Sequence, residues 1–403
     1  YTAANFPVDV QTGLPLLNLG PALTTLGGSG YSSNCPTNIS AAPGNPVNGQ
    51  GTCLIFGAGV QDPAAAKMAV GAKPTYEDEF VLGARFRVSE LFSVGLTGTY
   101  RNLGRVSEDT DFAPFLANYY CNGGANASAS QCDFYQNNSA YYIWNPGRSS
   151  QTVRDWVDPT KTVTLTGLAF PNPKRQYSSL VFDWKRADDG IWSLQGSITV
   201  ARSYGNYEGT VKSDAGNGAQ SDAGSTQDYD YLGLTDYSTG LLPNDRTFVF
   251  KTFGSYHVTD NLSFGTNVLV QSPQRLSCMG YHPTDANAAG YGASSFYCAY
   301  GPLNAAGNYT ATQPSPRGTG LRTDWVKQID LSFRYVLPQS LGFNRFVVRA
   351  DAFNIFNSQP ITQRYVQHEN QKAGNQYTPD PLYGTPQGYL TPRSVRLGFD
   401  ILF

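Results

Sequence analysis

The stretch Val-Arg-Leu-Gly-Phe-Asp-Ile-Leu-Phe, residues 395–403, decides the fold of this chain. In an extended strand its alternate positions form an apolar face, while Arg396, Gly398 and Asp400 fall on the other side. The apolar positions are Val395, Leu397, Phe399, Ile401 and Phe403. Such a strand suits a membrane β-barrel, in which the apolar face meets lipid and the polar face meets a wet lumen. Soluble sheets share this period, so its recurrence along the chain is what matters.

Eight further segments repeat the alternation. Each apolar stripe covers about 9–11 residues, the length that a tilted strand needs to cross a bilayer. The segments are 80–88, 92–101, 179–185, 192–200, 248–258, 262–270, 325–335 and 346–352. The pattern therefore indicates nine strands.

The connections between these strands alternate in length. Short turns are expected at 89–91, 187–190, 259–261 and 338–344, and long polar connections at 102–176, 203–245, 272–323 and 357–391. Outer-membrane barrels have short periplasmic turns and long extracellular loops. A soluble β-sandwich is the weaker alternative, because compact soluble domains rarely hold loops beyond about 15 residues. The sequence predicts an all-β fold, a transmembrane antiparallel β-barrel with long extracellular loops.

The composition agrees with this fold. The chain has 26 Tyr, 22 Phe and 5 Trp among 403 residues, which suits aromatic girdles at two membrane interfaces. Mean hydropathy is −0.34, as expected for spans that alternate in polarity. The net charge of −2 gives no argument for binding nucleic acid.

Nine strands cannot close a barrel by themselves when both of its ends lie in the periplasm, because single-chain bacterial barrels have even strand numbers. If the short turns are periplasmic, residues 1–76 form an extracellular loop segment. Residues 77–403 then form the carboxy-terminal part of a larger barrel. We expect the remaining strands to come from an upstream region or from another chain.

Six cysteines lie in the predicted outer connections. They allow fifteen pairings, but neighbours within one connection are the expected partners: Cys35 with Cys53, Cys121 with Cys132, and Cys278 with Cys298. Disulfides of this kind indicate an oxidising compartment. A metal site is the weaker reading, since the sequence holds no Cys-x-x-Cys.

Signals for catalysis are few, and we expect no enzyme. The chain has three histidines and lacks the zinc-protease, nucleophile-elbow and phosphate-loop motifs. His257 is expected at a membrane interface or in the lumen, and the adjacent His368 and Glu369 in solvent.

Charged residues on the polar faces of the strands are expected to face the lumen. They could contact a plug or guide a polar substrate; alternatively, they form a ladder that only links neighbouring strands. The set comprises Arg85, Arg87, Arg101, Asp183, Lys185, Lys251, Asp330, Arg334, Arg349 and Asp351.

Two loop features remain open at this point. An acidic stretch carries Asp214, Asp222, Asp228 and Asp230 among Gly and Ser. Clustered carboxylates can bind calcium, although a solvated loop explains them as well and no other cofactor is expected. Aromatic loop residues could stack on a sugar or peptide, or could pack the loops together; they include Tyr119, Tyr120, Tyr141, Tyr142 and Trp144.

Several motifs, in this order and spacing, resemble the TonB-dependent receptors, in particular their Oar-like branch. The motifs lie at 73–83, 177–183, 192–209, 240–246, 351–357 and 391–398, and they cover about four-fifths of the chain. The resemblance implies a barrel of roughly twenty-two strands or more whose lumen holds an amino-terminal plug. Neither the plug nor the segment that couples it to an inner-membrane energy complex is found in these residues.

The resemblance also implies partners and an assembly signal. Upstream strands, the plug and the energy complex would be protein partners, and the lipid bilayer and lipopolysaccharide would surround the barrel in the bacterial outer membrane. Arg396, Gly398, Ile401 and Phe403 resemble the signal that barrel-insertion machinery reads. Energy-coupled uptake of an unidentified ligand is the leading hypothesis; a passive porin, or a surface adhesin or scaffold with stapled loops, are the alternatives.

Overall fold

The computed structural model describes residues 31–32, 53–54, 67–122, 124–209, 226–337 and 345–402. The chain divides into two compact units, Tyr1–Ala65 and Ala66–Phe403. In the first unit, the described residues are the strands β1 (Tyr31–Ser32) and β2 (Cys53–Leu54), which pair antiparallel. The expected division at residues 76 and 77 stays a prediction.

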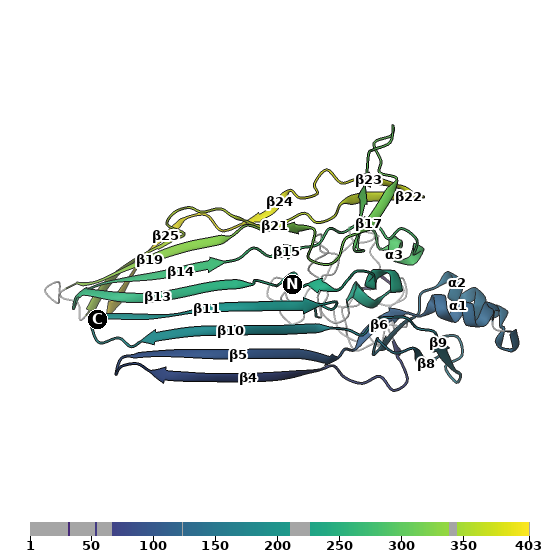
Figure 1. Cartoon of the computed structure of the whole chain (residues 1–403), viewed down its shortest axis with the longest axis horizontal. Helices are drawn as coiled ribbons and strands as arrows, with labels where there is room; N and C mark the ends of the chain where they lie inside the picture. The colour runs from purple at the N-terminus through teal and green to yellow at the C-terminus, as the bar shows by residue number, and fades with distance from the viewer. Residues whose placement is uncertain are drawn as a thin grey trace, which may run out of the picture. The chain divides into compact units, whose positions relative to one another are not determined.

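Nine long antiparallel strands dominate the second unit (Figure 1). Each pairs with the long strand before it in the sequence, so the sheet is an up-and-down meander. The strands are β4 (Tyr76–Arg87), β5 (Phe92–Arg105), β10 (Arg175–Arg186), β11 (Trp192–Gly205), β13 (Phe248–Thr259), β14 (Leu262–Gln271), β19 (Val326–Leu337), β20 (Arg345–Phe353) and β25 (Ser394–Leu402). All nine expected strands are confirmed, and most extend a few residues beyond the predicted segments.

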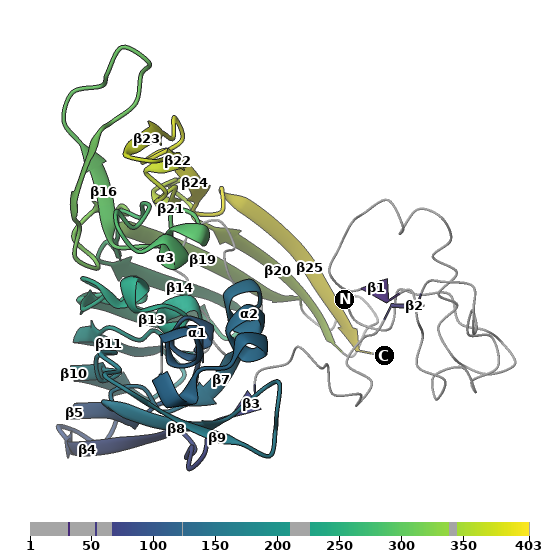
Figure 2. The same cartoon turned by 90° about the vertical axis from the view of Figure 1, so that its right-hand side faces the viewer.

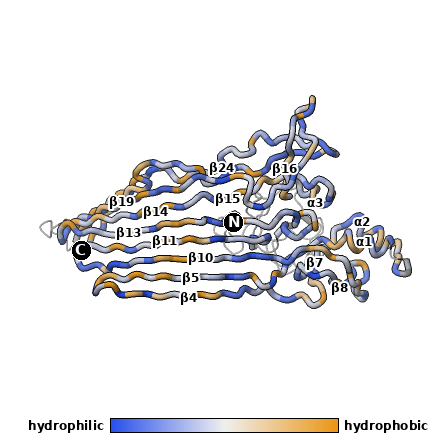
Figure 3. Tube along the Cα trace, in the orientation of Figure 1, coloured by the Kyte–Doolittle hydropathy of each residue, from blue (hydrophilic) through white to orange (hydrophobic). Residues whose placement is uncertain are grey.

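The hydrogen-bond register brings the apolar positions of neighbouring strands into line. One row joins Leu82, Gly98, Leu180, Val200 and Phe248 as direct partners across five strands. Directly opposed residues share a face of the sheet, so the apolar stripes merge into one band. Figure 3 shows hydrophobic and hydrophilic residues alternating along the strands. Many of the band's large side chains are exposed, including Leu82, Leu180 and Phe399. This is the surface that a membrane barrel turns to lipid.

The sheet is curved and has two edges. Figure 2 shows the strands bending round toward β20 and β25. β4 and β25 occupy the edges, and none of the described strands pairs with their outer sides. The fold is therefore part of a transmembrane β-barrel, as the odd strand number predicted.

The two ends of the sheet differ. At one end, strands join through short turns, such as residues 88–91 and 260–261. At the other end, the long connections fold into further elements, which we call the cap: the described residues of 106–174, 206–247, 272–325 and 354–393. None of the helices in the described part of the chain is long and apolar enough to cross a membrane.

The cap has a hydrophobic core of its own, which forms within the long polar connections. Its first part contains β6 (Glu108–Asp111), α1 (Ala113–Asn122), η2 (Gly124–Asn126), α2 (Ala129–Asn137), β7 (Tyr141–Trp144), β8 (Ser150–Arg154) and β9 (Thr162–Thr166), and the upstream strand β3 (Lys67–Met68) pairs with β7. Phe112, Leu116 and Trp144 are fully buried there. Aromatic and aliphatic residues scattered through a polar stretch thus gather into a core.

Short elements complete the cap. They are η3 (Gln227–Tyr229), η4 (Leu232–Thr235), β12 (Gly240–Leu241), β15 (Arg275–Leu276), α3 (Ala286–Gly290), β16 (Tyr297–Tyr300), β17 (Ala311–Pro314), β18 (Leu321–Arg322), β21 (Ile361–Arg364), β22 (Glu369–Ala373), β23 (Gln376–Pro379) and β24 (Pro386–Tyr389). A second, smaller core joins Met279, Phe296 and Val366 from distant connections.

Candidate functional site

The polar face of the sheet carries the residues expected in the lumen. Register pairs place Arg101 opposite Glu79, Asp183 opposite Gly95, and Lys251 opposite Ser197. Toward the β25 edge of the sheet, Arg334 pairs with Arg349 and Asp351 pairs with Arg396. By the same registers, Arg85, Arg87, Lys185 and Asp330 share this face, opposite the apolar band. The sheet thus gathers all ten residues onto one side.

Ion pairs cross from strand to strand on this face. Arg101 Nη2 lies 3.1 Å from Glu79 Oε1, Arg349 Nη2 lies 2.5 Å from Asp400 Oδ2, and Arg396 Nη2 lies 2.7 Å from Asp351 Oδ2. At least one side chain of each pair is about half exposed or more, so each pair contributes at most about 1 kcal/mol. These pairs form a ladder that links neighbouring strands, while a role of the face toward a plug or a substrate stays a prediction.

One ion pair spans two strand spacings because a glycine lies between its partners. Arg85 on β4 pairs with Asp183 on β10, passing over Gly95 of β5. A Cβ at Gly95 would collide with the Asp183 carboxylate. The glycine therefore leaves the room that this longer pairing needs.

Four cations among these ten residues have no ion-pair partner in the part of the chain that the structure describes. They are Arg87 on β4, Lys185 on β10, Lys251 on β13 and Arg334 on β19. Arg334 also faces Arg349 directly, which places two guanidinium groups on adjacent strands. These positions could attract an anionic group from a ligand or from a segment that fills the lumen.

A polar cavity of about 400 Å³ opens on the same face, at the ends of the strands nearest the cap. The guanidinium of Arg101 lies 6.0 Å from the ring centre of Tyr177, which is its direct partner across β5 and β10. The lining comprises Glu77, Thr99, Arg101, Arg175, Tyr177, Ser179, Val181, Ser203 and Asn244. Charged, aromatic and hydroxyl groups converge in this cavity, so it offers ion pairs, hydrogen bonds and an aromatic ring to a polar ligand.

Sequence reasoning did not find this cavity. It identified Arg101 but missed Glu77, Arg175 and Asn244, because the first two lie at strand starts and the third in a cap connection. The acidic run Glu77-Asp78-Glu79 was a signal that could have been used, because the short turn at 88–91 pairs its strand with the strand that holds Arg101.

Above the cavity, buried charges hold the cap together. Arg317 Nη2 lies 3.0 Å from Asp228 Oδ1, and both side chains are completely buried. Glu108, from a third connection, accepts a hydrogen bond from the backbone N–H of Thr226. Burial raises the pKa of Glu108 to about 9, so this carboxyl is protonated at neutral pH. Three connections distant in sequence thus meet at one buried polar cluster.

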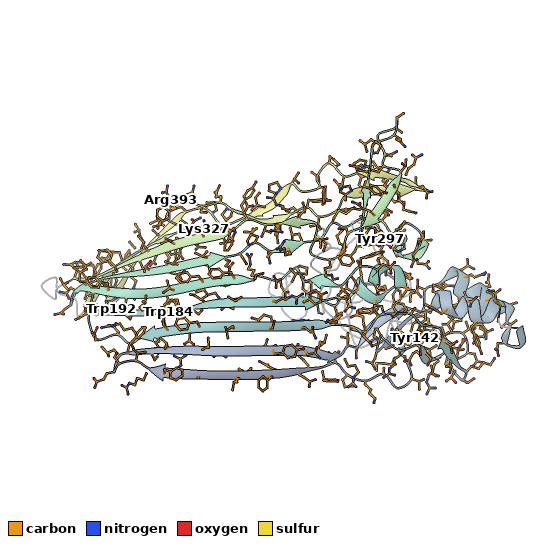
Figure 4. The ribbon with its side chains drawn as sticks, viewed as in Figure 1. Tyr142, Trp184, Trp192, Tyr297, Lys327 and Arg393 are labelled. Atoms are coloured by element: carbon orange, nitrogen blue, oxygen red, sulfur yellow. A yellow bond between two sulfur atoms is a disulfide. The ribbon has the colours of Figure 1, made fainter. Side chains whose placement is uncertain are left out.

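The loop aromatics pack the cap. Tyr142 and Trp144 are fully buried, and Tyr120 is nearly so. Trp144 Nε1 donates to Thr110 Oγ1 at 2.7 Å, and Tyr120 donates to the Asp155 carboxylate. Figure 4 shows Tyr142 within the cap. These side chains stabilise the cap and are not accessible for stacking on a ligand.

Two disulfides staple the cap. Cys121–Cys132 joins α1 to α2 with a Cα–Cα distance of 5.0 Å, and Cys278–Cys298 joins two segments of the connection between β14 and β19. Cys35 and the side chain of Cys53 lie outside the described residues.

The acidic stretch is described in part. Asp228 pairs with Arg317, and Asp230 Oδ2 accepts from the Tyr291 hydroxyl at 2.5 Å. Asp214 and Asp222 lie outside the described residues, as does Phe403 of the expected insertion signal. The calcium site and the insertion signal stay predictions.

The histidines make local contacts. His257 Nε2 lies 3.0 Å from Asp188 Oδ2 in a short turn, and His282 Nε2 lies 3.2 Å from Asp236 Oδ2. The expected solvation of the pair His368 and Glu369 is wrong, because Glu369 is fully buried. Its carboxylate instead accepts from the backbone N–H groups of Ala299 and Tyr281.

Comparison with known proteins gives one curated relative of note. The chain is 26% identical over 302 residues to the TonB-dependent transporter Oar of Myxococcus xanthus. The match covers 72% of this chain and 22% of the relative, so the chain spans about a fifth of that protein's length. No family model matches the chain.

Solved outer-membrane proteins are also similar. The transporter YddB from Escherichia coli aligns with a TM-score of 0.41 at 13% identity, covering 82% of this chain and 33% of that one. The ferripyoverdine receptor of Pseudomonas aeruginosa aligns with a TM-score of 0.37 at 10% identity, covering 81% of this chain and 27% of that one.

Nine antiparallel strands with a lipid-facing band and a charged inner face define the chain as part of an outer-membrane β-barrel. The similarity to the Myxococcus transporter agrees with the resemblance to TonB-dependent receptors, and to their Oar-like branch, that the sequence motifs carry. The relative is a transporter, in agreement with the expectation that this chain is not an enzyme.

Proposed function

We propose that the chain is the carboxy-terminal barrel portion of a receptor that takes up a ligand across the outer membrane with energy supplied from the inner membrane. The observation that carries this proposal is the polar cavity beneath the cap, on the same face as the charged ladder. A ligand that passes the cap would meet this cavity first. The similarity to a TonB-dependent transporter supports energy coupling.

The partners follow from the same arrangement. The lumen side would hold a plug, and Lys251 and Arg334 are cations that such a plug could engage. Upstream strands would pair with the free edges of β4 and β25. The energy complex of the inner membrane would act through the plug.

Lipopolysaccharide is a further proposed partner. Lys327 pairs with Val270 in a row of the apolar band, near the cap end of β19, and is labelled in Figure 4. A cation at the outer end of the lipid-facing surface suits the phosphates of an outer-leaflet lipid.

Conductance distinguishes a plugged receptor from a passive porin. We expect the protein purified from outer membranes to show no steady conductance in planar bilayers, because the plug blocks the lumen. A constant ohmic conductance at all voltages would support the porin instead.

Uptake distinguishes a transporter from an adhesin. Cells that lack the protein should fail to accumulate one component of a defined panel of labelled metal chelates, oligosaccharides and peptides. Deleting the inner-membrane energy complex should abolish the same accumulation while surface binding persists. Arg101→Ala, in the cavity, should weaken that binding, whereas Arg349→Ala, on the same face but outside the cavity, should leave it near the wild-type level. Binding without any energy-dependent accumulation would support the adhesin.

A further inference from the structure

A groove of about 380 Å³ interrupts the apolar band on the lipid-facing side of the sheet. The residues of the band that line it come from four neighbouring strands, β11, β13, β14 and β19. They are Trp192, Leu194, Gly254, Tyr256, Phe264, Thr266 and Leu331. The lining is almost entirely apolar, and its volume lies at the lower end of the roughly 300–1,000 Å³ typical of ligand pockets.

The register explains the groove. One row across the sheet reads Leu194, Gly254, Thr266 and Leu331, so two small residues lie between two leucines. The next row toward the short turns reads Trp192, Tyr256 and Phe264. Small side chains thus form the floor, the leucines form two sides, and aromatic rings close the end nearest the periplasm.

A nearby glycine shows that such a gap can be filled from within the protein. Gly196 lies one row further from the short turns, and the indole of Trp184 covers the space where its Cβ would be. At Gly254 the neighbouring side chain is Leu194, whose Cδ1 would lie 3.3 Å from an added Cβ, and the groove stays open beside it. Both labelled tryptophans can be followed in Figure 4.

The position of the groove identifies the leaflet. Trp192 is the first residue of β11, next to a short turn, so its row lies at the periplasmic interface where aromatic girdles occur. The Gly254 row is two residues further along the strand, about 7 Å at 3.3 Å per residue. The groove therefore opens into the hydrocarbon of the inner leaflet, just beyond the interface.

We propose that this groove binds one acyl chain of an inner-leaflet phospholipid. The groove is continuous with the lipid-facing band, and its large side chains are exposed; Trp192 and Tyr256 have 38% and 53% of their surface accessible. An apolar surface in contact with a bilayer is covered by lipid chains, and a concave one gives a chain contacts on several sides. The aromatic end would lie beside the glycerol region, and the chain would extend along the row of small residues.

Native mass spectrometry of the intact protein, extracted from outer membranes in mild detergent and doped with phosphatidylethanolamine, tests the proposal. Wild type should retain one phospholipid per protein. Thr266→Leu, which fills the groove and removes only the long 3.3 Å hydrogen bond from the Thr266 hydroxyl to the Asp330 carbonyl, should lose it. Gly98→Leu is the matched control: it adds the same side chain to the same band, at a site with no side chain within 4 Å of the new Cβ. This variant should retain the lipid.

Folding is checked by heat-modifiable migration on gels, and a second variant, Leu331→Ala, removes one side of the groove and should also lose the lipid. Equal retention by Thr266→Leu, Leu331→Ala and wild type overturns the proposal. If Gly98→Leu loses the lipid as completely as Thr266→Leu, the proposal is also overturned, because the lipid on the wild-type protein is then an adventitious additive only. So does a dimer that Thr266→Leu converts to monomer, since a second copy would then occupy the groove.

Discussion

Arg317→Met should loosen the cap while leaving the nine-stranded sheet intact. Arg317 and Asp228 are completely buried and 3.0 Å apart, and they join the connection before β13 to the connection before β19. Removing one partner of a buried pair costs about 3–5 kcal/mol, because the other charge stays buried without compensation. The sheet is held by its own rows of backbone hydrogen bonds. The free energy of cap opening should therefore fall by about this amount, while the free energy of unfolding the sheet should stay unchanged.

Hydrogen exchange followed by mass spectrometry measures this opening. At about 1.4 kcal/mol per factor of ten, amides of residues 226–245 should exchange roughly two to four orders of magnitude faster in the variant. Lys161→Met is the matched control in the cap: Lys161 Nζ lies 3.3 Å from Asp158 Oδ2, but their side chains are 62% and 33% exposed, so the loss should stay below about 1 kcal/mol. Replacing both buried partners, Asp228→Leu with Arg317→Met, should restore much of the protection. Wild-type exchange in the single variant would refute the reasoning.

Three further predictions concern the cap and the end of a strand. The pKa of Glu108 is about 9 in the folded cap, so between about pH 4.3 and pH 9 this carboxyl ionises only in the unfolded state. The free energy of cap unfolding should therefore fall by as much as about 1.4 kcal/mol for each pH unit in this range. Urea titrations followed by tryptophan fluorescence should show a weaker pH dependence in Glu108→Gln, and an equal dependence in both proteins would contradict the prediction. Replacing Cys121 and Cys132 by alanine should cost the cap about 3 kcal/mol, and calorimetry should show earlier unfolding. Asn354 has a φ of 50°, and its side-chain amide donates to the carbonyls of Ser358 and Thr391. Asn354→Ala should therefore lower the free energy of unfolding by about 1–3 kcal/mol, seen as a smaller fraction of heat-resistant folded protein on gels. Asn354→Gly should lower it less, because glycine adopts a positive φ without strain.

The barrel strands could be predicted from the sequence because successive side chains of a strand point to opposite faces. Where one face meets lipid and the other meets water, polar and apolar residues alternate. The alternation at Leu180, Phe182 and Trp184 requires no knowledge of the neighbouring strands, and the register then follows from aligning such stripes. The lumen-side charges were found by the same rule. Pairing partners such as Arg85 and Asp183 were not, because the pair depends on a glycine between them.

The cap and the polar cavity could not be predicted in this way. Glu108, Asp228 and Arg317 come together from positions separated by 89 residues or more, and no periodic pattern marks them. A polar residue in a loop is normally solvated, which is why Glu369 was expected in water. The buried state of such residues depends on long-range packing that a single sequence does not display.

The unbroken register has a consequence for how this protein can change. Within the nine long strands of the sheet, the pairing register shifts only near Tyr76 and at His257, close to the strand ends. Deleting one residue in the middle of β13 would turn Lys251 toward lipid and Phe250 toward the lumen, since one step reverses every side chain beyond it. Length variation, and with it new recognition, is therefore confined to the connections, where epitope tags and loop grafts should be tolerated while the spans accept only substitutions.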